Sequence, residues 1–400
     1  MKIRRIVPVL FFCTLLAAGF AGCGVGKGGA SPSGTQSAQD PPSPWNSVVV
    51  LVPSDPEDAN GAVNTSSKLQ VVHPFDANGN PLSTPAMSSL SYNGVGDFDA
   101  ASLTPGGGNG VMIDGGDNEL YFFSVANGTA SASRAPYRIN TTDTDGDSVS
   151  IMSSGDDAIV SLDDRNTLLL VSGILSGSFS ESYLSVPGYR DGVLISNDDK
   201  VLLARGSYGL TVYAINTNAL PGSNAFTDTT TPAVSGLGTS NVNGGGRDGM
   251  AFSPADSSRA VIITNGTSGS VSLLTGLPFK PSVSNSVSVG RKVFSVAIAP
   301  SGDRAIVGTD SGLMMFTGVA SGALTRVGGL YAPTYMLYNR SVTLGMVTTL
   351  GVTPDGKYAV AGDYTDGALL VIPMSTGGFD APVGILPGVE VPFNDEMLIH

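Results

Sequence analysis

One unit of sequence recurs along this chain, and it limits the possible folds more than any other feature. Its clearest copy covers residues 247–275, which read RDGMAFSPADSSRAVIITNGTSGSVSLLT and predict three short strands joined by two turns. Runs of β-branched residues bounded by Gly, Asn, Asp, Ser and Pro are typical of strands and hairpins. A chain built from such units is expected to fold as a repeated β-structure.

The unit returns with a regular spacing. Its first strand and turn recur at residues 100–106, 148–156, 192–199, 249–256, 295–303 and 350–356, about fifty residues apart, and a second and a third apolar strand follow each copy. Residues 47–52 and 68–73 supply only second and third strands, and residues 388–400 remain after the last unit. Periods of about 40–50 residues with four strands each are typical of propeller blades. We therefore predict an all-β fold: a seven-bladed β-propeller of four-stranded antiparallel blades, closed by pairing the C-terminal segment with the N-terminal blade.

Composition agrees with strands and turns. The chain has 53 Gly and 25 Pro, and only five of its 33 acidic residues are Glu. Asp favours turns because its side chain bonds nearby backbone, whereas Glu favours helices. The formal net charge of −13 argues against a nucleic-acid partner, which would require a basic surface.

The N-terminus predicts export. Residues 1–23 begin with basic side chains, continue with an apolar run over 6–20 and end in small residues, as a secretory signal does. Residues 20–23, FAGC, resemble the bacterial lipobox, which implies that Cys23 is lipidated and becomes the new N-terminus. Cys13 would be lost with the leader. The alternative is an ordinary signal peptide cut nearby, which would leave Cys23 as a free thiol.

The lipobox resemblance also implies a location. Gly24 follows the cysteine, which suggests the outer membrane, with the periplasmic or surface side left open. Residues 24–44 are rich in Gly, Ser and Pro and cannot bury enough apolar surface to fold, so they predict a disordered tether. The propeller domain is then expected over residues 45–400, held to the membrane by the lipid anchor alone.

The repeat also resembles a known family. Residues 254–274, PADSSRAVIITNGTSGSVSLL, and residues 354–372, PDGKYAVAGDYTDGALLVI, are similar to the YVTN-type propeller repeat. The sequence Ile263-Thr264-Asn265 comes nearest to the Y-V-T-N element. Bacterial lactonase-like propellers share this repeat, so the resemblance implies the propeller fold and raises lactone hydrolysis as a candidate activity.

Several kinds of active site lack the necessary residues. The chain has two His, His73 and His400, and two Cys, of which Cys13 belongs to the predicted leader. A Ser-His-Asp triad, a Cys-His pair and a site with several His ligands are therefore not expected. The sequence also lacks a phosphate-binding loop and a motif for covalent haem attachment. No cofactor is expected, apart from the calcium considered below.

Arginines recur just before the first strand of a unit. The candidate ligand-binding residues are Arg190, Asp191, Arg247, Asp248, Arg291 and Arg340. In a propeller the first strand lies nearest the axis, so equivalent positions would meet at one mouth and could bind a carboxylate or phosphate. The alternative is that the Arg-Asp pairs only connect neighbouring blades.

One acidic loop is a candidate metal site. Asp143, Asp145 and Asp147 alternate in a Gly-containing stretch, which resembles the opening of a calcium loop. No Glu closes the loop at its twelfth position, where Ser154 stands. Calcium and a solvated loop between blades are the two interpretations.

The sequence favours a binding or scaffold propeller at the bacterial cell envelope, with no catalytic residues assigned. We expect a monomer whose partner is an envelope protein or a small anionic ligand. A lactonase-like hydrolase, with or without calcium, is the first alternative, and a structural or adhesive surface protein is the second. Whether the chain is an enzyme is left open, with a non-catalytic role favoured.

Overall fold

The computed structural model describes residues 48–52, 66–76, 78–93, 98–104, 106–114, 118–126, 129–140, 146–162, 166–188, 192–206, 209–230, 234, 237, 249–265, 268–391 and 397–399. All of them belong to one compact unit within residues 41–400. The predicted leader, Cys23 and the tether of residues 24–44 lie outside the described residues and stay predictions. Among the residues that the structure describes, no helix has the length and apolar character needed to cross a membrane.

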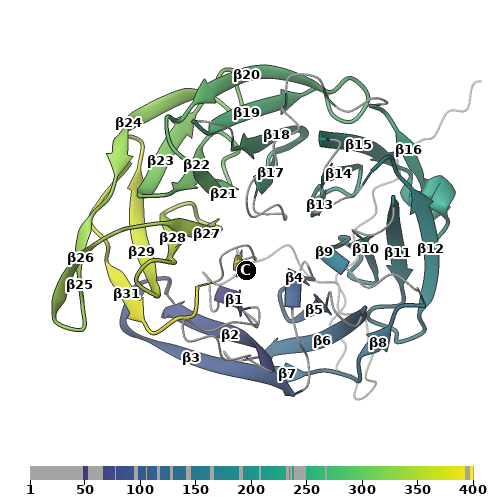
Figure 1. The fold of residues 1–400 in the computed structure, drawn as a ribbon, viewed down its shortest axis with the longest axis horizontal. Helices are drawn as coiled ribbons and strands as arrows, with labels where there is room; N and C mark the ends of the chain where they lie inside the picture. Colours follow the sequence, from purple (N-terminus) through teal and green to yellow (C-terminus); the bar gives the residue numbers. More distant parts are fainter. Residues whose placement is uncertain are drawn as a thin grey trace, which may run out of the picture. The chain divides into compact units, whose positions relative to one another are not determined.

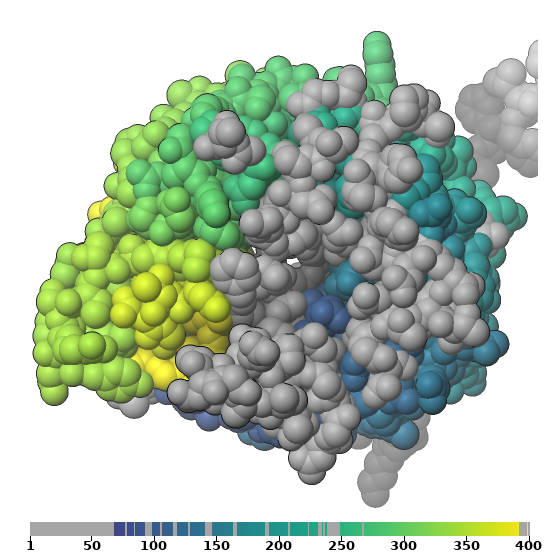
Figure 2. Space-filling view, in the orientation of Figure 1, coloured from purple at the N-terminus to yellow at the C-terminus, as the bar shows by residue number. Residues whose placement is uncertain are grey.

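The strands of this unit form seven sheets arranged as blades around a ring, which confirms the predicted seven-bladed β-propeller (Figure 1). The colours pass around the ring in chain order, so the last blade adjoins the first. Figure 2 shows the same ring in space-filling form, with the coloured segments again following one another in chain order. Each predicted first, second and third strand is present.

The first three blades, read from the inside outward, follow the chain after a closing strand from the C-terminus. Blade 1 contains β32 (Met397–Ile399), β1 (Val48–Val52), β2 (Ser66–Phe75) and β3 (Pro81–Asn93). Blade 2 contains β4 (Phe98–Leu103), β5 (Asn109–Asp114), β6 (Glu119–Ala126) and β7 (Thr129–Ala132), and β8 (Tyr137–Arg138) also pairs with β6. Blade 3 contains β9 (Gly146–Ile151), β10 (Asp157–Leu162), β11 (Thr167–Ser172) and β12 (Ser180–Ser185).

The next three blades repeat this order. Blade 4 contains β13 (Gly192–Ile195), β14 (Val201–Gly206), β15 (Gly209–Ile215) and β16 (Phe226–Asp228), with the 3-10 turns η1 (Thr217–Ala219) and η2 (Ser223–Ala225) before β16. Blade 5 contains β17 (Met250–Ser253), β18 (Asp256–Thr264), β19 (Ser270–Thr275) and β20 (Ser282–Ser288). Blade 6 contains β21 (Val293–Ile298), β22 (Ala305–Thr309), β23 (Gly312–Thr317) and β24 (Thr325–Tyr331).

Blade 7 follows an insertion that the repeat did not predict. The insertion is a hairpin of β25 (Thr334–Leu337) and β26 (Arg340–Thr343), which lies at the outside of the ring (Figure 1). Blade 7 itself contains β27 (Val347–Val352), β28 (Tyr358–Asp363) and β29 (Ala368–Ser375), with β30 (Gly378–Phe379) and β31 (Gly384–Pro387) both pairing with β29.

The core lies between the blades. The buried apolar side chains of the described residues form clusters, each between two successive blades, including the last blade and the first. Successive side chains of a strand point to opposite faces of its sheet. Ile306 and Val307 of β22 show the result, because Ile306 packs toward blade 7 and Val307 toward blade 5. Central strands are therefore apolar on both faces, which explains their continuous apolar runs.

Serine hydroxyls join neighbouring inner strands. Ser102 Oγ of β4 accepts a hydrogen bond from Ile151 N of β9 at 3.0 Å, and Ser150 Oγ of β9 accepts one from Ile195 N of β13 at 3.2 Å. The inner strand is the edge of its sheet, so its outward N–H groups have no further strand to pair with. A serine on the neighbouring blade satisfies them instead.

The C-terminal segment closes the ring as predicted. β32 pairs antiparallel with β1, which makes it the inner strand of blade 1. Before β32, Val389 and Val391 pack between blades 7 and 1. Glu390 lies between these valines, where its N–H donates to Gln70 Oε1 at 3.1 Å and its carboxylate forms an ion pair with Lys68.

Candidate functional site

The inner strands all begin at one end of the ring, which we call the starting rim. It is defined by the first residues of β4, β9, β13, β17, β21 and β27. Because the blades are antiparallel, the second strand of each blade ends at this rim and the third begins there. In blade 6, Val293 opens β21, Thr309 ends β22 and Gly312 opens β23, all in one register. Two kinds of connection therefore lie at this rim: the turn between the second and third strands of a blade, and the segment that leads into the first strand of the next blade.

Arg291 lies at the starting rim, in the connection that leads into β21. Its Nη1 donates a hydrogen bond to Ser311 Oγ and lies 3.5 Å from Asp310 Oδ1. Ser311 Oγ in turn donates to Asp310 Oδ1 at 2.8 Å. The Arg291 side chain keeps 31% of its surface exposed. A partly exposed ion pair of this length contributes little to stability, roughly 0–1 kcal/mol.

Asn265 fixes the backbone just after Arg291. Its Oδ1 accepts a hydrogen bond from Val293 N at 2.8 Å, and its Nδ2 donates to Val293 O at 2.6 Å. Asn265 is the last residue of the sequence element that resembles Y-V-T-N. Its structural role is to join the end of β18 in blade 5 to the start of β21 in blade 6.

Of the other predicted arginines, the structure describes only Arg340. Arg190, Asp191, Arg247 and Asp248 lie outside the described residues, and their predicted role stays a prediction. Arg340 opens β26 in the outer hairpin and is exposed, so it is not in a position equivalent to Arg291. The reason is the inserted hairpin, which separates Arg340 from the first strand of blade 7.

The predicted calcium loop is described only in part. Asp143 and Asp145 lie outside the described residues, while Asp147 is half-buried in β9. In the described part of the chain, no three or more His, Cys, Asp or Glu side chains group closely enough to hold a metal ion. Calcium binding by this loop stays a prediction that rests on its sequence.

Sequence reasoning overlooked a buried cation at the starting rim. Arg205 in β14 is only 6% exposed and lies opposite Gly192, the first residue of β13. The sequence signal that could have found it is the position of Arg205 directly after the apolar run of residues 201–204. Burying a charge is costly unless the group is paired, so Arg205 indicates a polar environment between the blades here.

A second overlooked group is Asp363, which ends β28 at the same rim and is fully buried. Its Oδ2 accepts hydrogen bonds from Tyr335 Oη at 2.9 Å and Gly345 N at 3.0 Å, and its Oδ1 accepts one from Thr365 N at 3.0 Å. Burial raises the pKa of Asp363, although these donors oppose the rise. Burial and the nearby carboxylate likewise raise the pKa of Tyr335. Asp363 thereby attaches the outer hairpin to blade 7.

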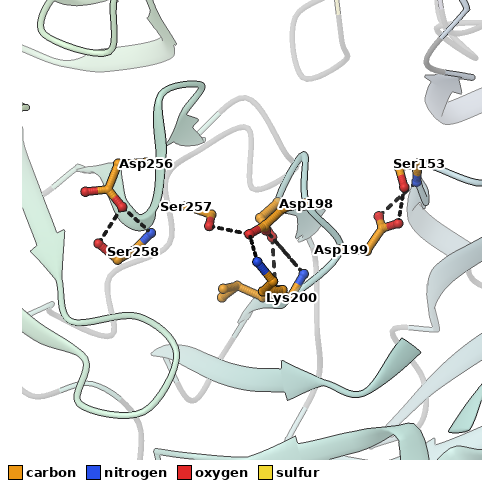
Figure 3. A network of polar contacts seen from close by, with 9 residues as sticks. Ser153, Asp198, Asp199, Lys200, Asp256, Ser257 and Ser258 are labelled. Atoms are coloured by element: carbon orange, nitrogen blue, oxygen red, sulfur yellow. Dashed lines mark hydrogen bonds and ion pairs between the residues drawn. The ribbon is translucent and has the colours of Figure 1, made fainter. Parts of the chain in front are cut away.

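The opposite end of the ring carries a polar network between the first turns of successive blades (Figure 3). Asp199 Oδ1 accepts a hydrogen bond from Ser153 N at 2.8 Å, and Asp198 Oδ2 accepts one from Ser257 Oγ at 2.8 Å. Partial burial opposes ionisation of Asp198, but hydrogen bonds from Ser196, Lys200 and Ser257 prevail and lower its pKa to about 2. These aspartates form turns and join blades 3, 4 and 5.

Comparison with known proteins identifies the fold. No protein-family model matches the sequence, and no curated protein sequence matches it either. Among solved structures, the chain is similar to the periplasmic gluconolactonase of Pseudomonas aeruginosa, with 15% identity and a TM-score of 0.59, covering 88% of this chain and 98% of that one. A protein from Bacteroides fragilis NCTC 9343, provisionally assigned as a 6-phosphogluconolactonase, has 16% identity and a TM-score of 0.62, covering 92% and 100%.

A protein of unknown function from Desulfotomaculum acetoxidans DSM 771 is about equally similar, with 16% identity and a TM-score of 0.61, covering 88% of this chain and 98% of that one. These matches run over nearly the whole length of both chains. At such identities they establish the architecture alone: the chain has the seven-bladed propeller fold that lactonase-like proteins and others share.

Proposed function

We propose that this protein is a lactonase-like propeller that hydrolyses the lactone of a sugar acid. The observation that carries the proposal is the end-to-end likeness of its ring to propellers named as gluconolactonase or, provisionally, 6-phosphogluconolactonase. In this reaction water adds to the lactone carbonyl and the ring C–O bond breaks, which yields a hydroxy acid and releases one proton. The product is a carboxylate, and a phosphorylated substrate is anionic from the start.

Arg291 is the residue of this chain best suited to contact such a substrate. It lies at the starting rim and its side chain is partly exposed. Guanidinium groups bind carboxylates and phosphates through charge-assisted hydrogen bonds. In an acidic protein with a net charge of −13, a cation at this rim supplies local attraction for an anion.

Proton release at constant pH tests the activity directly, with glucono-1,5-lactone and its 6-phosphate as substrates and spontaneous hydrolysis subtracted. Arg291→Gln is expected to lower kcat/KM by about 10- to 100-fold, the loss of one charge-assisted contact of about 1.5–3 kcal/mol. Arg340→Gln removes an arginine from the outer hairpin and serves as the matched control, with no change expected. Folded protein that releases no protons above the background from either lactone would overturn the proposal.

The calcium prediction is tested in the same assay. If Asp143, Asp145 and Asp147 hold calcium that the reaction needs, a chelator abolishes the rate and added calcium restores it. Asp147→Asn should then raise the calcium concentration needed for half of the full rate. A rate that is identical with chelator and with calcium rejects a catalytic role for the ion.

Binding of a small anionic ligand without turnover is the second candidate, and the partly exposed side chain of Arg291 favours it as well. Isothermal titration with gluconate and 6-phosphogluconate separates the two candidates. Heat that depends on Arg291, together with the absence of lactone hydrolysis, identifies a binding module.

We also propose that the propeller is exported and lipid-anchored through Cys23, with residues 24–44 as its tether. The support is the leader and lipobox-like sequence alone. Mass spectrometry of the N-terminal peptide tests this, because a diacylated Cys23 is expected there. An unmodified peptide that retains residues 1–22 would contradict the anchor.

A further inference from the structure

Arg291 is held from two sides by different blades. On one side, the connection that carries it is fastened to the turn between β18 and β19 of blade 5. Val289 N donates to Gly269 O at 3.0 Å, and Gly290 N donates to Ser268 O at 3.1 Å. Asn265 adds its two hydrogen bonds to Val293. The backbone of Arg291 therefore lies between two segments that blade 5 fixes.

Close packing reinforces this attachment. A Cβ atom at Gly269 would collide with the carbonyl oxygen of Arg291. Gly269 also has a positive φ of 42°, which favours glycine. The turn thus approaches the Arg291 backbone as closely as a glycine allows.

On the other side, blade 6 holds only one end of the guanidinium. Among the described residues, the polar contacts of the side chain both use Nη1, which meets Ser311 Oγ and Asp310 Oδ1. An arginine carries five N–H donors, in a planar fork. Within the described part of the chain, the Nε–Nη2 edge makes no hydrogen bond, and the side chain is 31% exposed. This edge has the spacing that matches two oxygens of a carboxylate or phosphate.

We propose that Asn265 is the positioning residue of an anion site, in which the Nε–Nη2 edge of Arg291 receives the carboxylate or phosphate of a sugar acid in bidentate fashion. Asn265 contacts no ligand. It acts by fixing Val293 and, through it, the backbone of Arg291, while Ser311 orients the guanidinium. A donor fork that is already in place loses little side-chain entropy when it binds. This inference rests on the proposed function only for the class of anion.

Binding measurements test the site without requiring catalysis. Isothermal titration of the full-length protein uses gluconate, 6-phosphogluconate and inorganic phosphate as probes. Arg291→Lys keeps the charge but loses the fork, and is expected to weaken binding about 10-fold. Asn265→Ala is expected to weaken it by a similar factor.

Amide hydrogen exchange supplies a readout that needs no ligand. Asn265→Ala should speed exchange over residues 289–293 and leave the other inner strands unchanged. The matched control is Asn285→Ala in the outer strand β20 of the same blade, which should change neither exchange at the rim nor affinity. Faster exchange with unchanged affinity overturns the positioning role, and wild-type protein that binds none of the three anions overturns the site. Anion binding without lactone hydrolysis rejects the proposed activity but supports the site.

Discussion

Closure of the ring by the C-terminal segment leads to a strong prediction about stability. Removing residues 388–400 deletes the inner strand of blade 1 together with the segment before it. Among the described residues of this segment, three buried side chains are lost: Val389, Val391 and Leu398, with exposures of 2%, 8% and 8%. At about 1.5–3 kcal/mol for each buried aliphatic side chain, the loss is roughly 5–9 kcal/mol. This is comparable with the whole stability of a typical domain, about 5–15 kcal/mol.

We therefore expect the truncated chain to be unfolded or aggregated, because β1 also becomes an open edge. Urea denaturation followed by fluorescence and circular dichroism measures the effect, with graded point variants beside the deletion. Val391→Ala should cost about 1.5–2.5 kcal/mol. Glu390→Gln removes only the ion pair between half-exposed Glu390 and Lys68 and should cost no more than about 1 kcal/mol. A truncated chain with the denaturation midpoint of the full chain would refute the closure argument.

Other predictions follow from single polar contacts. Tyr335→Phe removes a hydrogen-bond donor from buried Asp363 and should lower the free energy of unfolding by about 1 kcal/mol. Asp363→Ala leaves several donors without an acceptor and should lower it by about 2–4 kcal/mol. A double-mutant cycle that shows no coupling between the two residues would contradict the bond between them. Because the pKa of Asp363 is raised, the folded state holds the proton of this carboxyl more tightly than the unfolded chain does. The stability advantage of wild type over Asp363→Asn should therefore be largest at acidic pH and should fall as the pH rises above the ordinary pKa of 3.8. Ser150→Ala leaves Ile195 N without its acceptor, and denaturation should show a loss of about 1–3 kcal/mol; an unchanged midpoint would argue against the serine bridge. Because the pKa of Asp198 is lowered to about 2, its carboxylate stabilises the fold fully above the ordinary pKa of 3.8. The difference in Tm between wild type and Asp198→Asn should therefore disappear as the pH falls toward 2. A difference that stays constant would refute the lowered pKa.

The architecture was predictable because the same burial pattern recurs. Central strands pack on both faces, so each leaves a run of apolar residues bounded by turn residues. Outer strands leave a weaker signal. β20 reads Ser-Val-Ser-Asn-Ser-Val-Ser and alternates between exposed and half-buried side chains, so only two valines mark it as a strand. The fourth strands follow from the propeller period rather than from their own sequences.

The outer hairpin was not predicted, and the reason lies in its turn. Tyr338 and Asn339 join β25 to β26 with φ values of 48° and 64°. A two-residue turn with positive φ at both positions is usually Asn-Gly or a similar pair, and a tyrosine at the first position hides that signal. Without the hairpin, Arg340 was placed directly before the first strand of blade 7. Spacing alone therefore misplaced this arginine, whereas Arg291 has no insertion before its strand.

Contacts between blades show why the repeat determines the fold more firmly than the site. Arg259 Nη1 of blade 5 donates to Val319 O of blade 6 at 2.8 Å, and Arg304 Nη1 of blade 6 donates to Ser375 O of blade 7 at 3.1 Å. Each arginine immediately precedes a matching alanine of its second strand. In blade 7 the corresponding residue is Tyr358, whose ring packs on Phe75 of blade 1 with the centroids 5.3 Å apart. The same position therefore joins blades by a charged hydrogen bond in two cases and by aromatic packing in the third. The ring constrains the geometry of a position more than its residue type. Only coordinates therefore show that Arg259 and Arg304 bridge blades, whereas Arg291 uses only Nη1 for its contacts with the other described residues.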